Sequence, residues 1–175
     1  TLTINADVTA TTAKSAAILS RGRENGGDII INSGTITAIG GNTGIWAYGI
    51  AAGGNITAKE GTVIHASGGT GIYAETGNIH LAGEVTANAN GDDGSGVYAQ
   101  AGEVSLSTIS ISSSGVGISA YNGLTLNGVT ITNTADTGLG TVNGTLTINA
   151  DVTATTAKSA AILNRGLNEG GDIII

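Results

Sequence analysis

The sequence predicts an all-β protein that winds as a right-handed parallel β-helix, a β-solenoid with three short strands per turn and about 24 residues per turn. Three observations lead to this prediction. Short runs that alternate apolar with polar or small residues recur along the chain, as in 55–58, 62–65 and 71–74. Glycine-bearing turns separate these runs. The runs also return at a nearly constant interval, which is typical of a repeat architecture.

The repeat is measured from the glycine that precedes the first run of each unit. These glycines are Gly27, Gly54, Gly77, Gly102, Gly123, Gly144 and Gly171. Their intervals are 27, 23, 25, 21, 21 and 27 residues, and the unit that starts at Thr1 lacks only its leading glycine. Such a period is too short for a helix-containing repeat and too variable for a strict hexapeptide left-handed β-helix. Because crossovers between parallel strands are nearly always right-handed, we predict a right-handed coil.

The short repeats are part of a longer sequence repeat. Residues 145–175 match residues 1–31 at 27 of 31 positions, and the four differences fall in one predicted loop. We therefore predict that residues 1–144 form one complete six-turn period of a continuous solenoid and that residues 145–175 begin the next, near-identical period. Both ends fall inside the pattern, so we expect the chain to be an excerpt of a longer tandem array.

Alternation assigns the inward side chains of each run in chain order. The first runs contribute Leu2/Ile4, Ile29/Ile31, Ile56/Ala58, Ile79/Leu81, Val104/Leu106, Leu124/Leu126 and Leu146/Ile148. The second runs contribute Val8/Ala10, Ile36/Ala38, Val63/His65, Val85/Ala87, Ile109/Ile111, Val129/Ile131 and Val152/Ala154. The third runs contribute Ile18, Ile45/Ala47, Ile72/Ala74, Val97/Ala99, Ile118/Ala120, Leu139/Thr141 and Ile162. One turn has almost nothing to bury its apolar face against, so the turns must stack.

The composition suits a thin, regular interior and excludes several classes of function. The chain has 30 Gly and no Pro, Phe, Met or Cys, so its core alphabet is Ile, Val, Leu and Ala. Six basic and thirteen acidic residues give a net charge of −7 without a basic stripe, so we expect no nucleic acid partner. No apolar run is long enough to span a membrane. The lack of Cys excludes a disulfide or thiolate-metal scaffold.

Three aromatic residues, Trp46, Tyr73 and Tyr98, fall at the same expected outward position of successive units. Tyr48 and Tyr121 lie two residues further along their runs. Such a row could stack on sugar rings, because flat aromatic faces bury the apolar surface of a sugar. Packing between neighbouring strands would select the same residues. The sequence therefore offers Trp46, Tyr73 and Tyr98 as candidate glycan contacts and leaves both interpretations open.

Two sets of polar residues are expected to be structural. Asn5, Asn32, Asn127 and Asn149 directly follow first runs, and we expect them to stack as an amide ladder at a corner of the coil. Outward threonines resemble the Thr-x-Thr arrays of ice-binding proteins. Residues such as Ile64 and Glu84 interrupt that array, so ordinary β-propensity explains the threonines better.

Metal and catalytic sites are also weakly indicated. Asp92 and Asp93 could offer oxygen ligands to calcium, but the nonapeptide GGxGxDxUx of calcium-binding β-rolls is absent, so a solvated corner loop explains them better. His65 is expected to point inward, and with no second His and no Cys or carboxylate in matching register it is expected to be a hydrogen-bonded or locally bulged residue and not a metal ligand. Polysaccharide lyases and hydrolases use β-helices too, and they need carboxylates and basic groups that converge on one groove. No pair of acids stacks beside a base in adjacent units. We expect no enzyme, no cofactor and no metal.

The units GGNITAKEGTVIHASGG, GGDIIINSGTITAIGG and NGLTLNGVTITNTADTG resemble the repeats of large secreted bacterial β-helix proteins, similar to filamentous-haemagglutinin and autotransporter-type adhesins. The resemblance implies export, a location outside the cell or on the bacterial surface, and a rigid stalk or fibre that supports adhesion. It also implies that the partners are further repeats, or copies of the chain, placed end to end.

These expectations lead to one function and one alternative. The chain is expected to be a structural repeat segment of a long extracellular fibre or adhesin stalk, made rigid by stacked β-coils. The alternative is a glycan-binding β-helix module that uses the outward aromatic row on cell-surface glycans. Ice binding and polysaccharide cleavage are less favoured.

Overall fold

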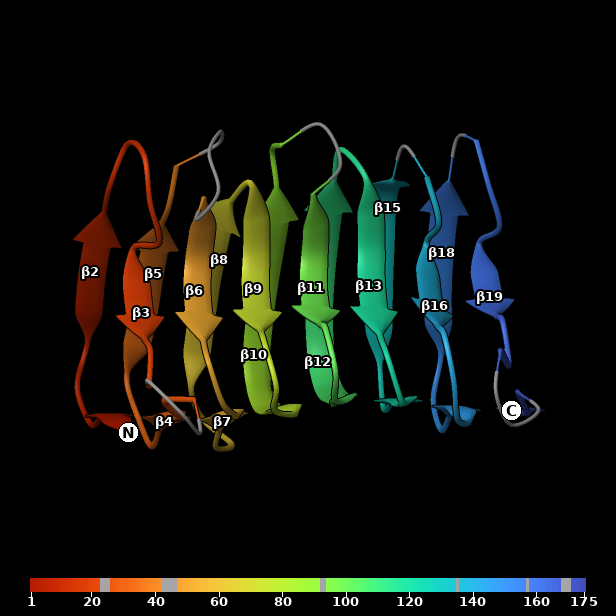
Figure 1. The fold of residues 1–175 in the computed structure, drawn as a ribbon, viewed down its shortest axis with the longest axis horizontal. Coiled ribbons are helices and arrows are strands. Elements are labelled where there is room, and N and C mark those ends of the chain that lie inside the picture. The colour runs from red at the N-terminus through yellow and green to blue at the C-terminus, as the bar shows by residue number, and fades with distance from the viewer. Residues whose placement is uncertain (23–25, 42–46, 92–93, 135, 157, 168–170) are drawn as a thin grey trace.

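The computed structural model describes residues 1–22, 26–41, 47–91, 94–134, 136–156, 158–167 and 171–175. This part of the chain contains strands and turns and no helix, and every strand pair is parallel. Figure 1 shows the strands side by side in a rod, with the N-terminus at one end and the C-terminus at the other. The predicted β-solenoid is therefore confirmed.

The strands form three rows along the rod. The first row contains β1 (Leu2–Ile4), β4 (Ile29–Ile31), β7 (Ile56–Ala58), β10 (Ile79–Ala89), β12 (Glu103–Ser113), β14 (Gly123–Leu126), β17 (Leu146–Ile148) and β20 (Ile173–Ile174). The second row contains β2 (Val8–Thr11), β5 (Thr35–Ile39), β8 (Val63–Gly68), the later parts of β10 and β12, β15 (Val129–Thr134) and β18 (Val152–Thr156). The third row, a sheet of its own, contains β3 (Ile18–Ser20), β6 (Tyr48–Ala52), β9 (Thr70–Ala74), β11 (Ser95–Ala99), β13 (Val116–Ala120), β16 (Leu139–Thr141) and β19 (Ile162–Asn164).

The coil is right-handed, as predicted. In Figure 1 the third row lies in front and its strands run downwards, whereas the second row lies behind and its strands run upwards. The chain advances from left to right as it circulates in this sense. The third row has seven strands, one for each turn of the coil.

Two turns of the coil do not have three separate strands. β10 and β12 each continue from the first row into the second as one strand of 11 residues. Their pairing shifts register between Leu81 and Glu84, where the chain bends around the corner without leaving the ladder. A short connection between the two runs explains this, because it leaves no residues to form a separate turn.

The core consists of continuous columns of aliphatic side chains. In the first row, strand pairing places Ile29, Ile56, Ile79, Val104, Leu124 and Leu146 in one column. All six are almost completely buried. The remaining inward pairs predicted for the first runs stack in the same way. Each turn therefore buries its apolar face against the turns on either side.

The inward register predicted for the third turn of the second row is wrong. The buried residues there are Ile64 and Ala66, which pair with Ile36 and Ala38, whereas His65 is exposed. The cause is Thr62, which is only 1 % exposed and donates its hydroxyl to the Lys59 carbonyl oxygen at 2.7 Å. This residue ends the turn by pointing inward. The inward and outward positions of β8 are therefore shifted by one residue from the prediction, so each side chain of the strand faces the opposite side.

The register predicted for the second turn of the third row is also wrong. Ile50 and Ala52, rather than Ile45 and Ala47, fill the column between Ile18 and Ile72. Ala47 is buried but precedes the strand, and residue 45 lies outside the described residues. A longer connection between the second and third rows in this turn moves the strand forward along the sequence. The other third-row columns are as predicted.

The predicted amide ladder is present at one corner. Asn32 Nδ2 donates to Asn5 Oδ1 at 2.8 Å, and Asn149 Nδ2 donates to Asn127 Oδ1 at 2.9 Å. The intervening turns carry other residues at this position, so the ladder consists of two separate rungs. Its role is structural, since each amide ties one turn to the next.

A second corner ladder precedes the first row and was not predicted. Asp28 Oδ1 accepts hydrogen bonds from the backbone nitrogen and Nδ2 of Asn55, at 2.8 and 3.2 Å. Asn55 Oδ1 accepts from the backbone nitrogen of Asn78, and Asn78 Oδ1 accepts from that of Glu103, each at 2.9 Å. Four successive turns are thus joined by side chains that accept from the backbone of the next turn.

Candidate functional site

The aromatic candidates lie on the outer side of the third row. Tyr73 and Tyr98 are direct partners on β9 and β11, as predicted. Tyr48 pairs with Thr70 and not with a residue beyond Tyr73, so its predicted place in the row is wrong. The residue that pairs with Tyr73 in the preceding turn is Ala51. Trp46 lies outside the described residues.

The three tyrosine rings nevertheless form a continuous stack. The rings of Tyr48 and Tyr73 are parallel within 7°, with centroids 4.6 Å apart. The rings of Tyr73 and Tyr98 are tilted by 50°, with centroids 5.7 Å apart. The Tyr73 hydroxyl donates to Gln100 Oε1. Tyr73 is only 7 % exposed, because its neighbours cover both faces of its ring. The stack therefore favours the packing interpretation for Tyr73.

Burial also raises the pKa of two tyrosines in this stack. Burial, followed by the neighbouring Tyr48, Glu75 and Tyr98, raises the pKa of Tyr73 to about 12, and Arg21 opposes the rise. Burial and then Glu75 raise the pKa of Tyr48 as well. Tyr48 and Tyr73 are neutral at pH 7, as an ordinary tyrosine is, and burial keeps them neutral to higher pH. The end of the stack at Tyr98 adjoins Ser119 of the next turn, which carries no ring.

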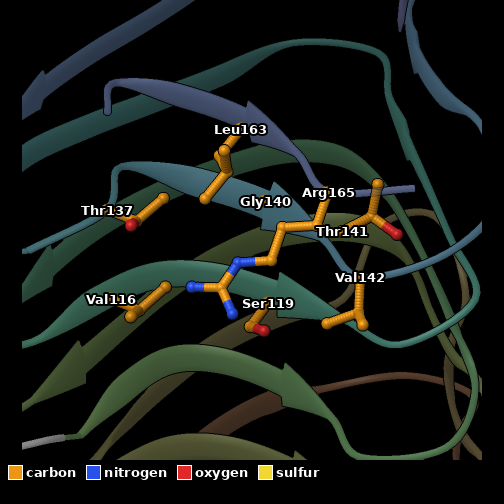
Figure 2. A pocket seen from close by; sticks show the side chains of 8 residues that line it. All are labelled: Val116, Ser119, Thr137, Gly140, Thr141, Val142, Leu163 and Arg165. Atoms are coloured by element: carbon orange, nitrogen blue, oxygen red, sulfur yellow. The ribbon is translucent and has the colours of Figure 1, made fainter. Parts of the chain in front are cut away.

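Beyond Tyr98, the outward-facing residues of the third row are no longer aromatic. The next residues in register are Ser119 on β13, Gly140 on β16 and Leu163 on β19. Two small residues therefore follow two tyrosines. They leave a hollow of about 130 Å³ in the surface. Figure 2 shows this hollow, which is lined by Val116, Ser119, Thr137, Gly140, Thr141, Val142, Leu163 and Arg165. Sequence reasoning missed it, although the small outward residues after Tyr98 were a visible signal.

Arg165 is the one ionisable side chain that lines this hollow. It is exposed, and Figure 2 shows it stretched across the strands with its guanidinium group pointing toward Ser119. Within the described part of the chain, neither the Arg165 guanidinium nor the Ser119 hydroxyl has a side-chain hydrogen bond or ion pair. The Thr141 hydroxyl donates to the Asn143 carbonyl oxygen at 2.5 Å, and the Thr137 hydroxyl lies 3.3 Å from that of Ser159. Among the described residues, the polar side chains of the hollow that have no hydrogen-bond or ion-pair partner are therefore Arg165 and Ser119.

The outward hydroxyl row of the second face is more regular than predicted. Strand pairing aligns Thr9, Thr37, His65, Thr86, Ser110, Thr130 and Thr153. Ile64 points inward and does not interrupt this row, contrary to expectation, and His65 interrupts it instead. His65 is thus a surface residue with Thr37 and Thr86 beside it, which corrects its predicted inward position.

Other candidates give no converging chemistry in the described residues. Asp92 and Asp93 lie outside them. No group of three or more His, Cys, Asp or Glu side chains within the described ranges is placed to hold a metal ion. A second hollow of about 380 Å³ lies on the first face beside Thr125, and Glu103 is the one ionisable residue in its lining. No helix in the described part of the chain is long and apolar enough to cross a membrane.

No protein family, no curated protein and no solved structure matches the chain. Its function is therefore argued from its geometry and from the pattern of its repeats.

Proposed function

We propose that the chain is a structural repeat segment of a long extracellular fibre or adhesin stalk, in which stacked β-coils form a rigid rod. One observation carries this proposal: the aliphatic columns run unbroken through all seven turns, from Ile18 to Ile162 in the third row. Each turn depends on its neighbours for burial, so the favourable way to extend the structure is to add turns.

The junction between the two near-identical segments supports growth by repetition. Leu146 and Ile148, which begin the second copy, pair with Leu124 and Leu126 in the same register as any other two turns. Leu146 is fully buried, whereas Leu2, its counterpart at the start of the chain, is 36 % exposed. The last turn of one period thus provides the surface that the first turn of the next period needs. Periods joined in this way make one rod without a hinge.

The rod geometry gives a length that can be measured. Parallel strands lie about 4.8 Å apart, so the six turns of one period advance the rod by roughly 29 Å. The extracellular location follows from the likeness of the repeats to secreted bacterial adhesins. A rod of this kind serves to project a distal domain from a surface or to form a filament.

Electron microscopy of chains with two, four and eight joined copies of residues 1–144 tests the proposal. We expect rods of constant width whose length grows by roughly 29 Å for each added period. A matched series with Ile72→Asp in every period should not form rods, because that change buries a charge in the column. Particles that become rounder as periods are added, or lengths that do not grow in proportion, would contradict a continuous rod.

A glycan-binding role remains the second candidate, but the structure restricts where it could act. The rings of Tyr48, Tyr73 and Tyr98 stack on one another, so most of their faces are not available to a sugar. Tyr98 is half-buried, and the hollow beyond it gives a sugar access to this end of the surface. Any glycan contact is therefore expected there and not along the whole aromatic row.

A further inference from the structure

The hollow lies where the aromatic row stops. Tyr98 pairs with Ser119, and Ser119 pairs with Gly140, so two turns lack a large outward side chain directly beside a tyrosine. Leu163 and Arg165 border the far side of the gap. A ring that entered the hollow would continue the stack of Tyr48, Tyr73 and Tyr98 in the direction of the rod.

The polar groups of the hollow select a charged ligand. Arg165 places a guanidinium over the gap, and no acidic side chain is among the lining residues. A guanidinium binds a carboxylate through two parallel hydrogen bonds, which are stronger than those between neutral groups. In a chain with a net charge of −7, this local positive charge is an exception. It favours a carboxylate ligand over a neutral or cationic one.

The remaining lining favours a sugar ring as the carrier of that carboxylate. Val116, Val142 and Leu163 present apolar surface, which matches the C–H faces of a pyranose, and Ser119 offers a free hydroxyl to a sugar hydroxyl. Gly140 has no side chain, so a ring can approach the backbone at this point. The adjoining Tyr98 adds an aromatic surface of the type that packs on sugars.

We propose that this hollow binds a carboxylated sugar ring, the repeating unit of an acidic polysaccharide such as a polyuronate. The Arg165 guanidinium holds the carboxylate, Ser119 contacts a ring hydroxyl, and Tyr98 packs against an apolar face of the ring or of the next sugar. This proposal restricts the glycan-binding alternative to the hollow and to acidic sugars. It does not depend on whether the rod belongs to a fibre.

The near-repeat supplies an internal control for this site. Arg21 is the counterpart of Arg165 in the first copy. The charge of Arg21 acts on Tyr48 and Tyr73, so aromatic rings lie near this arginine. The same arginine at the same strand end therefore faces two different surfaces. Among the described residues, the hollow that could take a ring lies at Arg165.

The test is isothermal titration of the full chain with oligogalacturonate at low and high salt. Arg165→Gln is expected to weaken binding by about tenfold or more, since it removes hydrogen bonds between two charged groups, which are stronger than those between neutral groups. Arg165→Lys should give an intermediate loss because it keeps the charge without the two parallel hydrogen bonds. Ser119→Leu, which fills the hollow, should abolish binding. Lys158→Gln and Arg21→Gln should change affinity by less than about twofold, and higher salt should weaken binding.

Two further ligands make the outcome decisive. The same oligosaccharide with its carboxyl groups reduced to alcohols should not bind, and binding equal to that of the acid would overturn the role of Arg165. Polyglutamate should bind much more weakly than oligogalacturonate, and equal binding would overturn the role of the sugar ring. If oligogalacturonate does not bind the wild-type chain at millimolar concentration, or Arg165→Gln binds as wild type while its circular dichroism is unchanged, the proposal is wrong. None of these results would alter the lengths measured for the rod.

Discussion

Ile29 and Ile173 stand at equivalent positions of the two near-identical segments, yet Ile29 has no exposed surface and Ile173 is 47 % exposed. Ile29 lies between Leu2 and Ile56 in its column. Ile173 belongs to β20 and pairs with Leu146 on one side only. Burial in this fold is therefore a property of the stack, since the same residue in the same local sequence is covered or exposed according to its neighbours.

This pair gives the first prediction. Ile29→Ala should lower the free energy of unfolding by about 2–5 kcal/mol, because it leaves a cavity between two covered neighbours. Ile173→Ala removes the same atoms from a position that is already half exposed and should cost about 1 kcal/mol or less. Urea denaturation followed by circular dichroism measures both. Equal losses for the two variants would contradict the explanation by stacking.

A second prediction tests the corrected register of β8. Ile64→Asp should unfold the third turn and weaken its neighbours, because it places a charge in the apolar core. His65→Asp should be tolerated, since that side chain already faces solvent. Thermal melting of the two variants and of the wild type provides the comparison. A stable Ile64→Asp protein together with an unfolded His65→Asp protein would restore the register predicted from the sequence.

A third prediction concerns high pH. A tyrosine in an unfolded chain titrates near pH 10, whereas the pKa of folded Tyr73 is about 12. Above pH 10 the unfolded chain loses this proton first. The stabilisation by the protonated phenol is therefore complete below pH 10 and is lost as the pH rises toward 12. Denaturation curves across this range should show falling stability, and ultraviolet absorbance should show a late-titrating tyrosine.

Tyr73→Phe is the control for this pH effect. The variant keeps the ring stack with Tyr48 and Tyr98 but has no phenol to ionise, so its stability should fall less steeply between pH 10 and 12. Tyr48, whose pKa is also raised, should account for part of the fall that remains. An unchanged slope in Tyr73→Phe would show that the pH dependence arises elsewhere.

A fourth prediction concerns the second corner ladder. Asn55→Ala removes the hydrogen bond from Nδ2 to Asp28 and the acceptor for the Asn78 backbone nitrogen. Because these groups are exposed and water can replace them, we expect a loss of about 0.5–1.5 kcal/mol in the free energy of unfolding. Glu103→Ala should cost almost nothing, since Glu103 joins the ladder through its backbone nitrogen. A larger loss for Glu103→Ala than for Asn55→Ala would argue against the ladder.

Much of the fold could be predicted because its information is local and repeated. The alternation in runs such as 79–81 and 104–106 identifies inward residues, and the regular spacing brings them into one column. The amide pairs of Asn5 with Asn32 and Asn127 with Asn149 follow from the same register. Repetition helped because each unit gave independent support for the alignment of the others.

Predictions failed where a connection changed length. The turn before β8 ends at Thr62, whose side chain points inward. Each residue that follows in the strand, including His65, therefore faces the side opposite to the predicted one. The loop before β6 moves Tyr48 away from its expected place in the aromatic row. Neither event alters the composition or the alternation of the run itself. An alternating strand sequence looks the same whichever set of its residues points inward. Only the pairing with neighbouring strands decides which set that is.

The sequence by itself determined that this chain is a right-handed coil of short parallel strands, because a repeating apolar alternation with glycine turns can bury its residues only by stacking. The tertiary structure decided which surfaces that coil presents. It brought Tyr48 onto Tyr73, covered the Tyr73 ring that was expected to be free, and opened a hollow over Ser119 and Gly140 beneath Arg165. These features arise between residues about 20 or more positions apart, so their geometry depends on the register between turns, which strand pairing fixes and local sequence does not.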